Sequence, residues 1–287
     1  MDLTSLQTIK YIKNKYGFFM SKGLGQNFLL DKSVLNQIVE AADFDESSGA
    51  LEIGPGIGVL TACLAENAKK VTALEIDTRL MDVLDETLAD YNNIKVINSD
   101  VLKTNLPELI NNEFSDCSNV SIAANLPYYI TTPILTRLLE DDALNVKNIV
   151  VMVQKEVAER LCAAPKTKSY SALSVLVAYH CTAKIVTIVP SSSFAPPPKV
   201  DSAVVKLTMR QSPAVAPKNE KNFFKTVRAA FGQRRKTLVN ALCGSGIFAM
   251  TKDEIKAKVL SVGISENARG EELSLEQFCA LSDALFE

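Results

Sequence analysis

The stretch LEIGPGIGVLT, residues 51–61, sets three glycines between an apolar run and the start of an amphipathic helix. Gly54, Gly56 and Gly58 allow the backbone to turn sharply and to approach a ligand closely. A dinucleotide site of the GxGxxG type would need its third glycine at position 59, which is Val59, so the spacing argues against NAD. We therefore expect a loop that binds a ligand other than NAD. The alternative is a glycine-rich turn that binds no ligand.

Apolar strands and amphipathic helices alternate around this loop. Ser33 can cap a helix over residues 34–42. The predicted strands are 50–54, 71–76, 94–98, 120–125 and 148–153, and the helical segments between them are 59–68, 78–90, 106–111 and 132–141. This alternation predicts an α/β fold, with an open, mostly parallel sheet that is covered by helices on both faces.

The pattern changes in the second half of the chain. Residues 182–190 and 202–209 look like two strands joined by a proline-rich loop, which predicts an antiparallel pair at the sheet edge. Residues 211–219 have the proline and polar content of a linker, and the chain after them is helical. We therefore expect an N-terminal arm (1–21) with a short helix, an α/β domain (22–210) and a small all-helical domain (211–287).

Composition narrows the class of protein. Apolar residues make up 47% of the 287 residues and charged residues 22%, which predicts a packed core. The N-terminus lacks the features of a signal peptide, and no apolar run reaches the roughly 18 residues needed to span a bilayer, so we expect a cytoplasmic protein without a membrane partner. Six scattered cysteines without a CxxC pair and a single histidine, His180, argue against a metal site, a disulfide framework or a histidine-based triad.

Carboxylates follow the predicted strands at the edge where open α/β sheets bind ligands. Glu75 ends the second strand, where it can accept two hydrogen bonds from a ribose diol, and Asp77 is a weaker candidate. Asp100 follows the third strand and can accept from an adenine amino group. We assign the adjacent Ile76 and Val101 to the same pocket. The alternative is that these acidic residues are ordinary turn or strand-end residues.

NLPY, residues 125–128, ends the fourth strand at the same edge. The chemistry that this motif could serve is methylation of an exocyclic amine. An adenine N6 is a poor nucleophile in such a reaction because its lone pair is delocalised into the ring. The Asn125 side-chain oxygen and the Leu126 carbonyl can hold its N–H groups, favour sp³ geometry and stabilise the developing positive charge without a strong general base. Pro127 stiffens the turn, and Tyr128 offers a ring for base stacking. The alternative is a strand-ending turn with a buried tyrosine; we expect Tyr129 to be a packing residue.

A second aromatic side chain can close the other face of a bound base. SSSFAPPPKVDS, residues 191–202, holds Phe194 before three consecutive prolines. Such a loop is stiff, and we expect it to keep the phenyl ring exposed at low entropic cost. The alternative is an extended linker that happens to contain a phenylalanine.

Taken together, five segments make the chain resemble the small-subunit ribosomal RNA adenine N6,N6-dimethyltransferases, from about Lys22 to the C-terminus. They are KGLGQNFLLD (22–31), EIGPGIGVLT (52–61), NLPYYITTPI (125–134), FAPPPKVDSAVV (194–205) and FGQRRKTLVNAL (231–242). The resemblance implies a Rossmann-like methyltransferase domain and a helical RNA-binding domain.

The same resemblance implies the ligands. S-adenosylmethionine would be the methyl donor, and no metal would be needed. The donor pocket would be lined by Gln26, Asn27, Leu29, Gly54, Gly56, Glu75, Asp100 and Asn125, and Phe194 would join Tyr128 in sandwiching the target base. The substrate would be two adjacent adenines in a hairpin loop near the 3′ end of 16S rRNA, each methylated twice. We expect a monomer that acts on a pre-30S subunit and has a role in its biogenesis.

A basic segment lies in the helical part of the chain, although the net charge is −2. Between residues 218 and 236 it includes Arg228, Arg234, Arg235 and Lys236, the last three at a predicted helix start, where cations oppose the helix dipole. RNA phosphates would explain them, and a solvated charged face is the alternative.

Three rival functions share parts of this pattern. One is the methylation of a large-subunit rRNA adenine, which confers macrolide resistance; the FAPPPKVDS segment and the long helical C-terminal part favour the small subunit. The others are DNA adenine methylation and a non-catalytic role in ribosome assembly.

Overall fold

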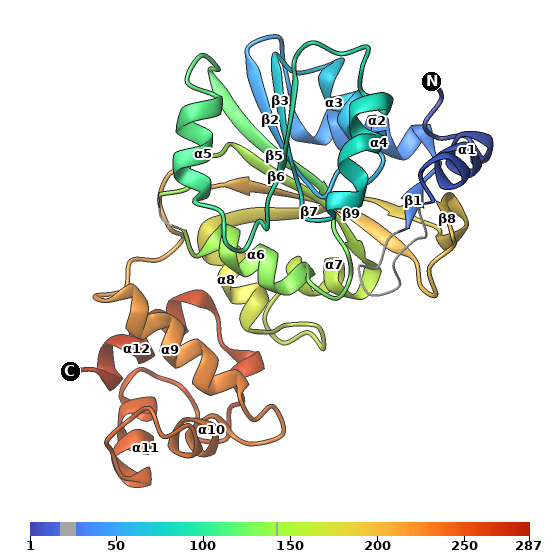
Figure 1. The fold of residues 1–287 in the computed structure, drawn as a ribbon. Helices are drawn as coiled ribbons and strands as arrows, with labels where there is room; N and C mark the ends of the chain where they lie inside the picture. The colour runs from blue at the N-terminus through green and yellow to red at the C-terminus, as the bar shows by residue number, and fades with distance from the viewer. Residues whose placement is uncertain (18–26, 142) are drawn as a thin grey trace. The chain divides into compact units, whose positions relative to one another are not determined.

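The computed structural model describes residues 1–17, 27–141 and 143–287, and they form two compact units (Figure 1). Unit 1 consists of Met1–Ala158 and Ala183–Met209, and unit 2 consists of Glu159–Thr182 and Arg210–Glu287. Residues Glu159–Thr182, which we assigned to the α/β domain, therefore cluster with the C-terminal helices. None of the helices in the described part of the chain has both the length and the apolar character needed to cross a membrane.

Unit 1 is built on a seven-stranded sheet with the strand order β4-β3-β2-β5-β6-β9-β7. The strands are β2 (Ser48–Ile53), β3 (Lys70–Glu75), β4 (Ile94–Asn98), β5 (Asn119–Asn125), β6 (Asn148–Gln154), β7 (Cys181–Val189) and β9 (Ser202–Met209). Strands β2 to β6 pair in parallel and β9 is antiparallel to β6, which confirms the predicted mostly parallel sheet. A separate two-stranded sheet pairs β1 (Phe28–Leu29) with β8 (Phe194–Ala195).

Helices pack on both faces of this sheet. Unit 1 contains α1 (Leu6–Tyr16), α2 (Lys32–Ala42), α3 (Val59–Ala65), η2 (Thr78–Leu80), α4 (Met81–Thr87), α5 (Leu106–Glu113) and α6 (Thr131–Leu139), and α7 (Lys155–Leu161) follows β6 directly. Side chains from α2, α3 and α4 share one buried cluster with Ala50 of β2, and Figure 1 shows these three helices gathered on one side. Phe114, just after α5, packs against the neighbouring Gly49, where a Cβ would lie 2.4 Å from its ring. Gly49 and Ala50 are successive residues of β2 and face opposite sides of the sheet. Helix α5 therefore covers the face opposite to α2, α3 and α4.

Helix starts differ from the prediction at two places. We expected Ser33 to cap α2, but the cap is Asp31, whose side chain accepts a hydrogen bond from the Ser33 N–H at 3.0 Å. The helix begins two residues earlier than expected, and a carboxylate at the cap position also interacts favourably with the helix dipole. The helix predicted for 78–90 is instead the short η2 and α4, with Asp77 as the cap of η2.

Apart from the first two residues of β7, the described elements of unit 2 are helical. These are α8 (Ala172–His180), α9 (Glu220–Phe231), α10 (Leu238–Gly244), α11 (Lys252–Ser261), η4 (Gly270–Glu272) and α12 (Leu275–Leu285). The ring of Tyr179 in α8 lies 5.1 Å from the rings of both Phe223 and Phe224 in α9. Tyr170 is also buried, and its hydroxyl donates to the Leu273 carbonyl at 3.1 Å. Aromatic packing therefore fixes α8 among helices that come much later in the sequence.

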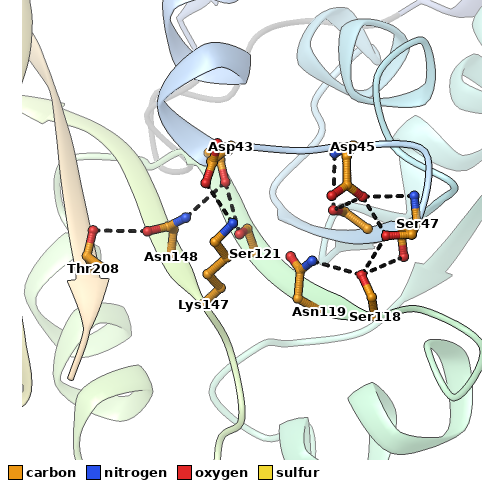
Figure 2. Close-up of polar contacts among 11 residues, drawn as sticks. Asp43, Asp45, Ser47, Ser118, Asn119, Ser121, Lys147, Asn148 and Thr208 are labelled. Atoms are coloured by element: carbon orange, nitrogen blue, oxygen red, sulfur yellow. Dashed lines mark hydrogen bonds and ion pairs between the residues drawn. The ribbon is translucent and has the colours of Figure 1, made fainter. Parts of the chain in front are cut away.

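A polar network lies where β5 and β6 begin, at the end of the sheet opposite to the glycine loop (Figure 2). Asn148 is 1% exposed; its Nδ2 donates to the Ala42 carbonyl at 3.0 Å, and its Oδ1 accepts from the Thr208 hydroxyl at 3.0 Å. The Ser121 hydroxyl donates to the same Ala42 carbonyl at 3.1 Å. The last carbonyls of a helix have no partner within the helix, so these side chains satisfy one end group of α2 inside the core.

We predict that Asn148→Ala lowers the free energy of unfolding by about 1–3 kcal/mol, because it removes one buried and one partly buried hydrogen bond and leaves the Thr208 hydroxyl without its acceptor. Urea unfolding measures the change. Lys147→Ala is the matched control, because it breaks only the exposed Lys147–Asp43 pair (2.6 Å) next to Asn148, at a cost of less than about 1 kcal/mol. Equal losses in the two variants would contradict a stabilising role for the buried amide.

Candidate active site at the carboxyl edge of the sheet

One pocket of unit 1 collects residues that follow the carboxyl ends of neighbouring strands. Apart from the weaker candidate Asp77, all the described residues that we predicted for the cofactor or the target base line it: Asn27, Leu29, Gly54, Gly56, Glu75, Ile76, Asp100, Val101, Asn125, Leu126, Pro127, Tyr128 and Phe194. Gln26 lies outside the described residues. Segments as distant in sequence as β1, the glycine loop and β8 therefore meet at one site.

The glycine loop leaves room for a ligand. Gly54 has φ 72° and Gly56 has φ 61°, a left-handed conformation that favours glycine. A Cβ at Gly54 would meet no atom within 4 Å, so the space beside its backbone is open. A Cβ at Gly56 would lie 3.3 Å from the ring of Phe28, a tight contact that adds to the strain of a side chain at positive φ.

Glu75 ties the glycine loop to the end of β3. Its Oε2 accepts from the Gly56 N–H at 3.2 Å, and its Oε1 accepts from the Asp77 N–H at 2.8 Å. Burial raises the pKa of this carboxyl, and the two backbone hydrogen bonds oppose that shift. Because a carboxylate oxygen can accept more than one hydrogen bond, Glu75 keeps acceptor capacity for a ligand.

The other two carboxylates of this edge differ in their surroundings. Asp77 holds the Arg79 guanidinium through two contacts, at 2.8 Å to Nε and 2.6 Å to Nη2, so a structural role accounts for its carboxylate. Asp100 accepts from the Leu102 N–H at 3.0 Å, and its side chain remains partly exposed in the pocket.

The Asn-Leu-Pro-Tyr turn presents two oxygen acceptors. Asn125 Nδ2 donates to the Asn27 carbonyl at 3.3 Å, and the Leu126 N–H donates to the Met152 carbonyl at 3.1 Å. Among the described residues, no group donates to Oδ1 of Asn125 or to the carbonyl of Leu126. These two adjacent acceptors are therefore available to a ligand with N–H groups.

Two tyrosines follow in the same turn. The Tyr128 hydroxyl lies 2.7 Å from the hydroxyl of buried Ser202, which fixes a half-buried ring, and burial raises the pKa of this tyrosine. Tyr129, which we expected to be a packing residue, lines the pocket and is 57% exposed. The chain turns into α6 at this point, and the turn leaves the second tyrosine at the surface.

Phe194 is not exposed as we expected. Its side chain is 4% exposed and belongs to the same buried cluster as Phe28 and Leu29. The reason is the pairing of β8 with β1, which sets Phe194 opposite Leu29. The ring still lines the pocket, but as part of its wall and not as a free platform.

Glu52, the acidic residue that precedes the glycine loop, also lines the pocket. It lies in β2, is 1% exposed, and no described group donates to its Oε2. Burial raises its pKa to about 8, because an ionised carboxylate is poorly solvated there. A charged residue inside the apolar run before the glycine loop was the sequence signal for this site.

The four predicted RNA-binding residues lie in unit 2, and none of them is among the residues that line this pocket. Arg228 is exposed on α9, and Arg234, Arg235 and Lys236 are exposed in the turn between α9 and α10. We found no group of three or more potential metal ligands among the residues that the structure describes.

The sheet order and the pocket at the carboxyl ends of its strands define a Rossmann-like methyltransferase. Within that class, the model of the family described as ribosomal RNA adenine dimethylase matches residues 18–286, and the chain belongs to this family.

Relatives and solved structures agree with that family. The chain is 48% identical to ribosomal RNA small subunit methyltransferase A of Bacillus pumilus and 50% identical to the protein of that name from Bacillus cereus; each match covers 99% of this chain and 97% of the relative. A dimethyladenosine transferase from Plasmodium falciparum has a similar structure, with a TM-score of 0.73 and 30% identity over 88% of this chain and 95% of the other. The 23S rRNA methyltransferase ErmE also has a similar structure, with a TM-score of 0.67 and 28% identity over 91% of this chain and 100% of the other.

We predict that Glu52→Gln makes the protein more stable than the wild type at pH 8, by on the order of a few kcal/mol, and that the difference shrinks toward pH 5. The unfolded chain releases the Glu52 proton near the ordinary pKa of 4.5, whereas the folded chain holds it until about pH 8. Wild-type stability therefore falls as the pH rises between these values. Urea unfolding at several pH values measures this, with exposed Glu46→Gln as the control. A difference that does not change with pH would contradict a neutral Glu52.

Proposed function

We propose that the protein transfers methyl groups from S-adenosylmethionine to N6 of two adjacent adenines in a hairpin loop near the 3′ end of small-subunit rRNA, giving N6,N6-dimethyladenosines. Its partner is then a small ribosomal subunit during assembly. The family and the names of relatives about 50% identical support the reaction and the subunit. The observation that carries the chemistry is the pair of unused acceptors on Asn125 and Leu126.

The pocket suits the proposed methyl donor. The open space at Gly54 admits a ligand against the backbone, and Glu75 retains acceptor capacity for ribose hydroxyls. Asp100 would accept from the adenine amino group, while Ile76 and Val101 offer apolar contacts to the ring. A positively charged ligand would make ionisation of the buried Glu52 carboxyl more favourable, and the ionised group would in turn stabilise that ligand. When bound, the donor supplies an electrophilic methyl group.

Asn125 and Leu126 would prepare the nitrogen that is methylated. The hydrogen bond from Asn125 Nδ2 to the Asn27 carbonyl fixes the amide, so that Oδ1 can accept one N–H of the target amine and the Leu126 carbonyl the other. Held in this way, the nitrogen moves toward sp³ geometry and its lone pair becomes available. Positive charge develops on it during attack, and the two fixed oxygens stabilise that charge. The proton then passes to water, so no histidine is required.

Two rings would hold the target base. The Tyr128 ring is fixed through Ser202 and can stack on one face of an adenine. Phe194 forms part of the pocket wall and can contact the other face. Both rings are held in place before binding, which reduces the entropy lost when a base enters.

The direct test uses radiolabelled S-adenosylmethionine and ribosomal subunits that lack the modification. We expect label in the small subunit only, recovered as N6,N6-dimethyladenosine after nucleoside digestion. Label in large-subunit rRNA, or in another nucleoside, would contradict the proposed substrate and favour one of the rival enzymes.

In the same assay, Asn125→Ala should lower kcat by about 100-fold or more, because it removes an acceptor aimed at developing charge. Affinity for S-adenosylmethionine, measured by calorimetry, should change little, since the other pocket residues remain. Asn111→Ala on the exposed surface of α5 is the matched control and should behave as wild type. Near-normal turnover of Asn125→Ala would rule out its assigned role.

Tyr128→Ala should lower kcat/KM by about 5- to 150-fold, the equivalent of the roughly 1–3 kcal/mol that base stacking provides. Tyr128→Phe loses only the contact with Ser202 and should retain most of the activity. The two variants separate the ring from the hydroxyl. If Tyr128→Phe lost as much activity as Tyr128→Ala, stacking would not be the function of this side chain.

A further inference from the structure

Arg234 joins three segments of unit 2 that are distant in sequence. Its Nη2 donates to the carbonyls of Lys168 at 2.8 Å and Tyr170 at 3.3 Å, and it lies 3.4 Å from Oε2 of Glu271. The N–H of Lys166 donates to the Glu271 carbonyl at 2.8 Å. The loop 164–170 is therefore held beside the turn 233–236, although 64 to 66 residues separate Arg234 from its carbonyl partners.

This arrangement gathers uncompensated positive charge. Lys166 and Lys168 in the loop and Arg235 and Lys236 in the turn are all exposed. Within the described parts of the chain, none of these four side chains forms an ion pair, whereas Arg234 is paired with Glu271. Four like charges on two adjacent segments repel one another, and an anionic partner would relieve that repulsion.

The backbone of Lys166 adds a second observation. It has φ 67°, a left-handed conformation that is uncommon for a residue with a side chain. The Lys166–Glu271 hydrogen bond and a bond from the Thr167 hydroxyl to the Ala164 carbonyl (2.7 Å) hold the loop in this shape. Backbone conformations of this kind persist where the surrounding contacts impose them, and they concentrate at functional sites.

We propose that the loop 164–168 and the turn 233–236 form one RNA-phosphate-binding surface, here called the two-segment basic surface. Lys166, Lys168, Arg235 and Lys236 would contact phosphates, and Arg234 would act as a positioning residue that holds the two segments together. The inference rests on the proposed function and deepens it, because it adds Lys166 and Lys168 to the contacts with rRNA.

The chemistry of the two segments favours phosphates over bases. Their sequences, APKTK (164–168) and QRRK (233–236), contain no aromatic side chain on which a base could stack. Lysine binds a phosphate as a point charge, and such contacts position a nucleic acid without reading its sequence. The surface therefore serves to orient the small subunit, while the pocket of unit 1 would select the adenine.

The test is the salt dependence of binding to unmethylated small subunits by full-length Lys166→Ala/Lys168→Ala. Each lost phosphate contact should reduce the slope of log K against log salt by about 0.7–1, so the double variant should lose about 1.4–2. Lys166→Arg/Lys168→Arg keeps both charges and should restore the slope. The matched control is Lys184→Ala/Lys252→Ala, which removes the same charge from exposed positions on β7 and α11 and should leave the slope nearly unchanged.

Chemical footprinting gives an independent measurement. With bound small subunits, Lys166 and Lys168 should be protected from acetylation at least several-fold, while Lys252 should remain reactive. The two-segment basic surface alone would be overturned by three results together. The wild-type protein methylates small subunits, Lys166→Ala/Lys168→Ala binds them like the control variant, and the loop is not protected from acetylation. A wild-type protein that methylates no small-subunit adenine would instead overturn the proposed function.

Discussion

The end of β5 is the constraint on which the candidate site depends. Strand β5 is central in the sheet, paired in parallel with β2 on one side and β6 on the other. The Leu126 N–H extends the ladder to Met152 by one hydrogen bond, and Pro127, which has no N–H, ends it. The Pro127 carbonyl then closes the turn by accepting from Ile130 and Thr131. The turn is thus satisfied without Oδ1 of Asn125 or the Leu126 carbonyl, and both acceptors stay available.

The neighbouring strands give this site its electrostatic character. Glu52 on β2 and Glu75 at the end of β3 are both buried, and burial raises the pKa of each. The neighbouring Glu75 also makes ionisation of Glu52 less favourable. A positively charged ligand between them would relieve both costs at once. This is a physical reason for the proposed sulfonium donor to suit the pocket better than a neutral or anionic ligand.

The sequence allowed most of the sheet and the pocket lining to be predicted, because both depend on local patterns. The run IKVIN is strand β4, and the acidic residues after β3 and β4 lie at the pocket because parallel strands end at one edge. The prediction and the structure differ where distant segments decide the outcome. The burial of Phe194 depends on its pairing with Leu29, and the grouping of α8 with unit 2 depends on aromatic contacts to α9. Neither can be seen in the sequence near those residues.

Charge counting along the sequence has the same limitation. A basic run such as Arg234, Arg235 and Lys236 shows how much positive charge is present but not how much of it is already bound within the protein. In the structure the guanidinium of Arg234 contacts two carbonyls and a carboxylate of its own unit, while its two neighbours form no ion pair among the described residues. The contacts of Arg234 hold the loop with Lys166 and Lys168 beside the turn. From the sequence alone we assigned these two lysines to the α/β domain. A recognition surface assembled from two segments needs such an internal connection, because like charges would otherwise drive the loop and the turn apart.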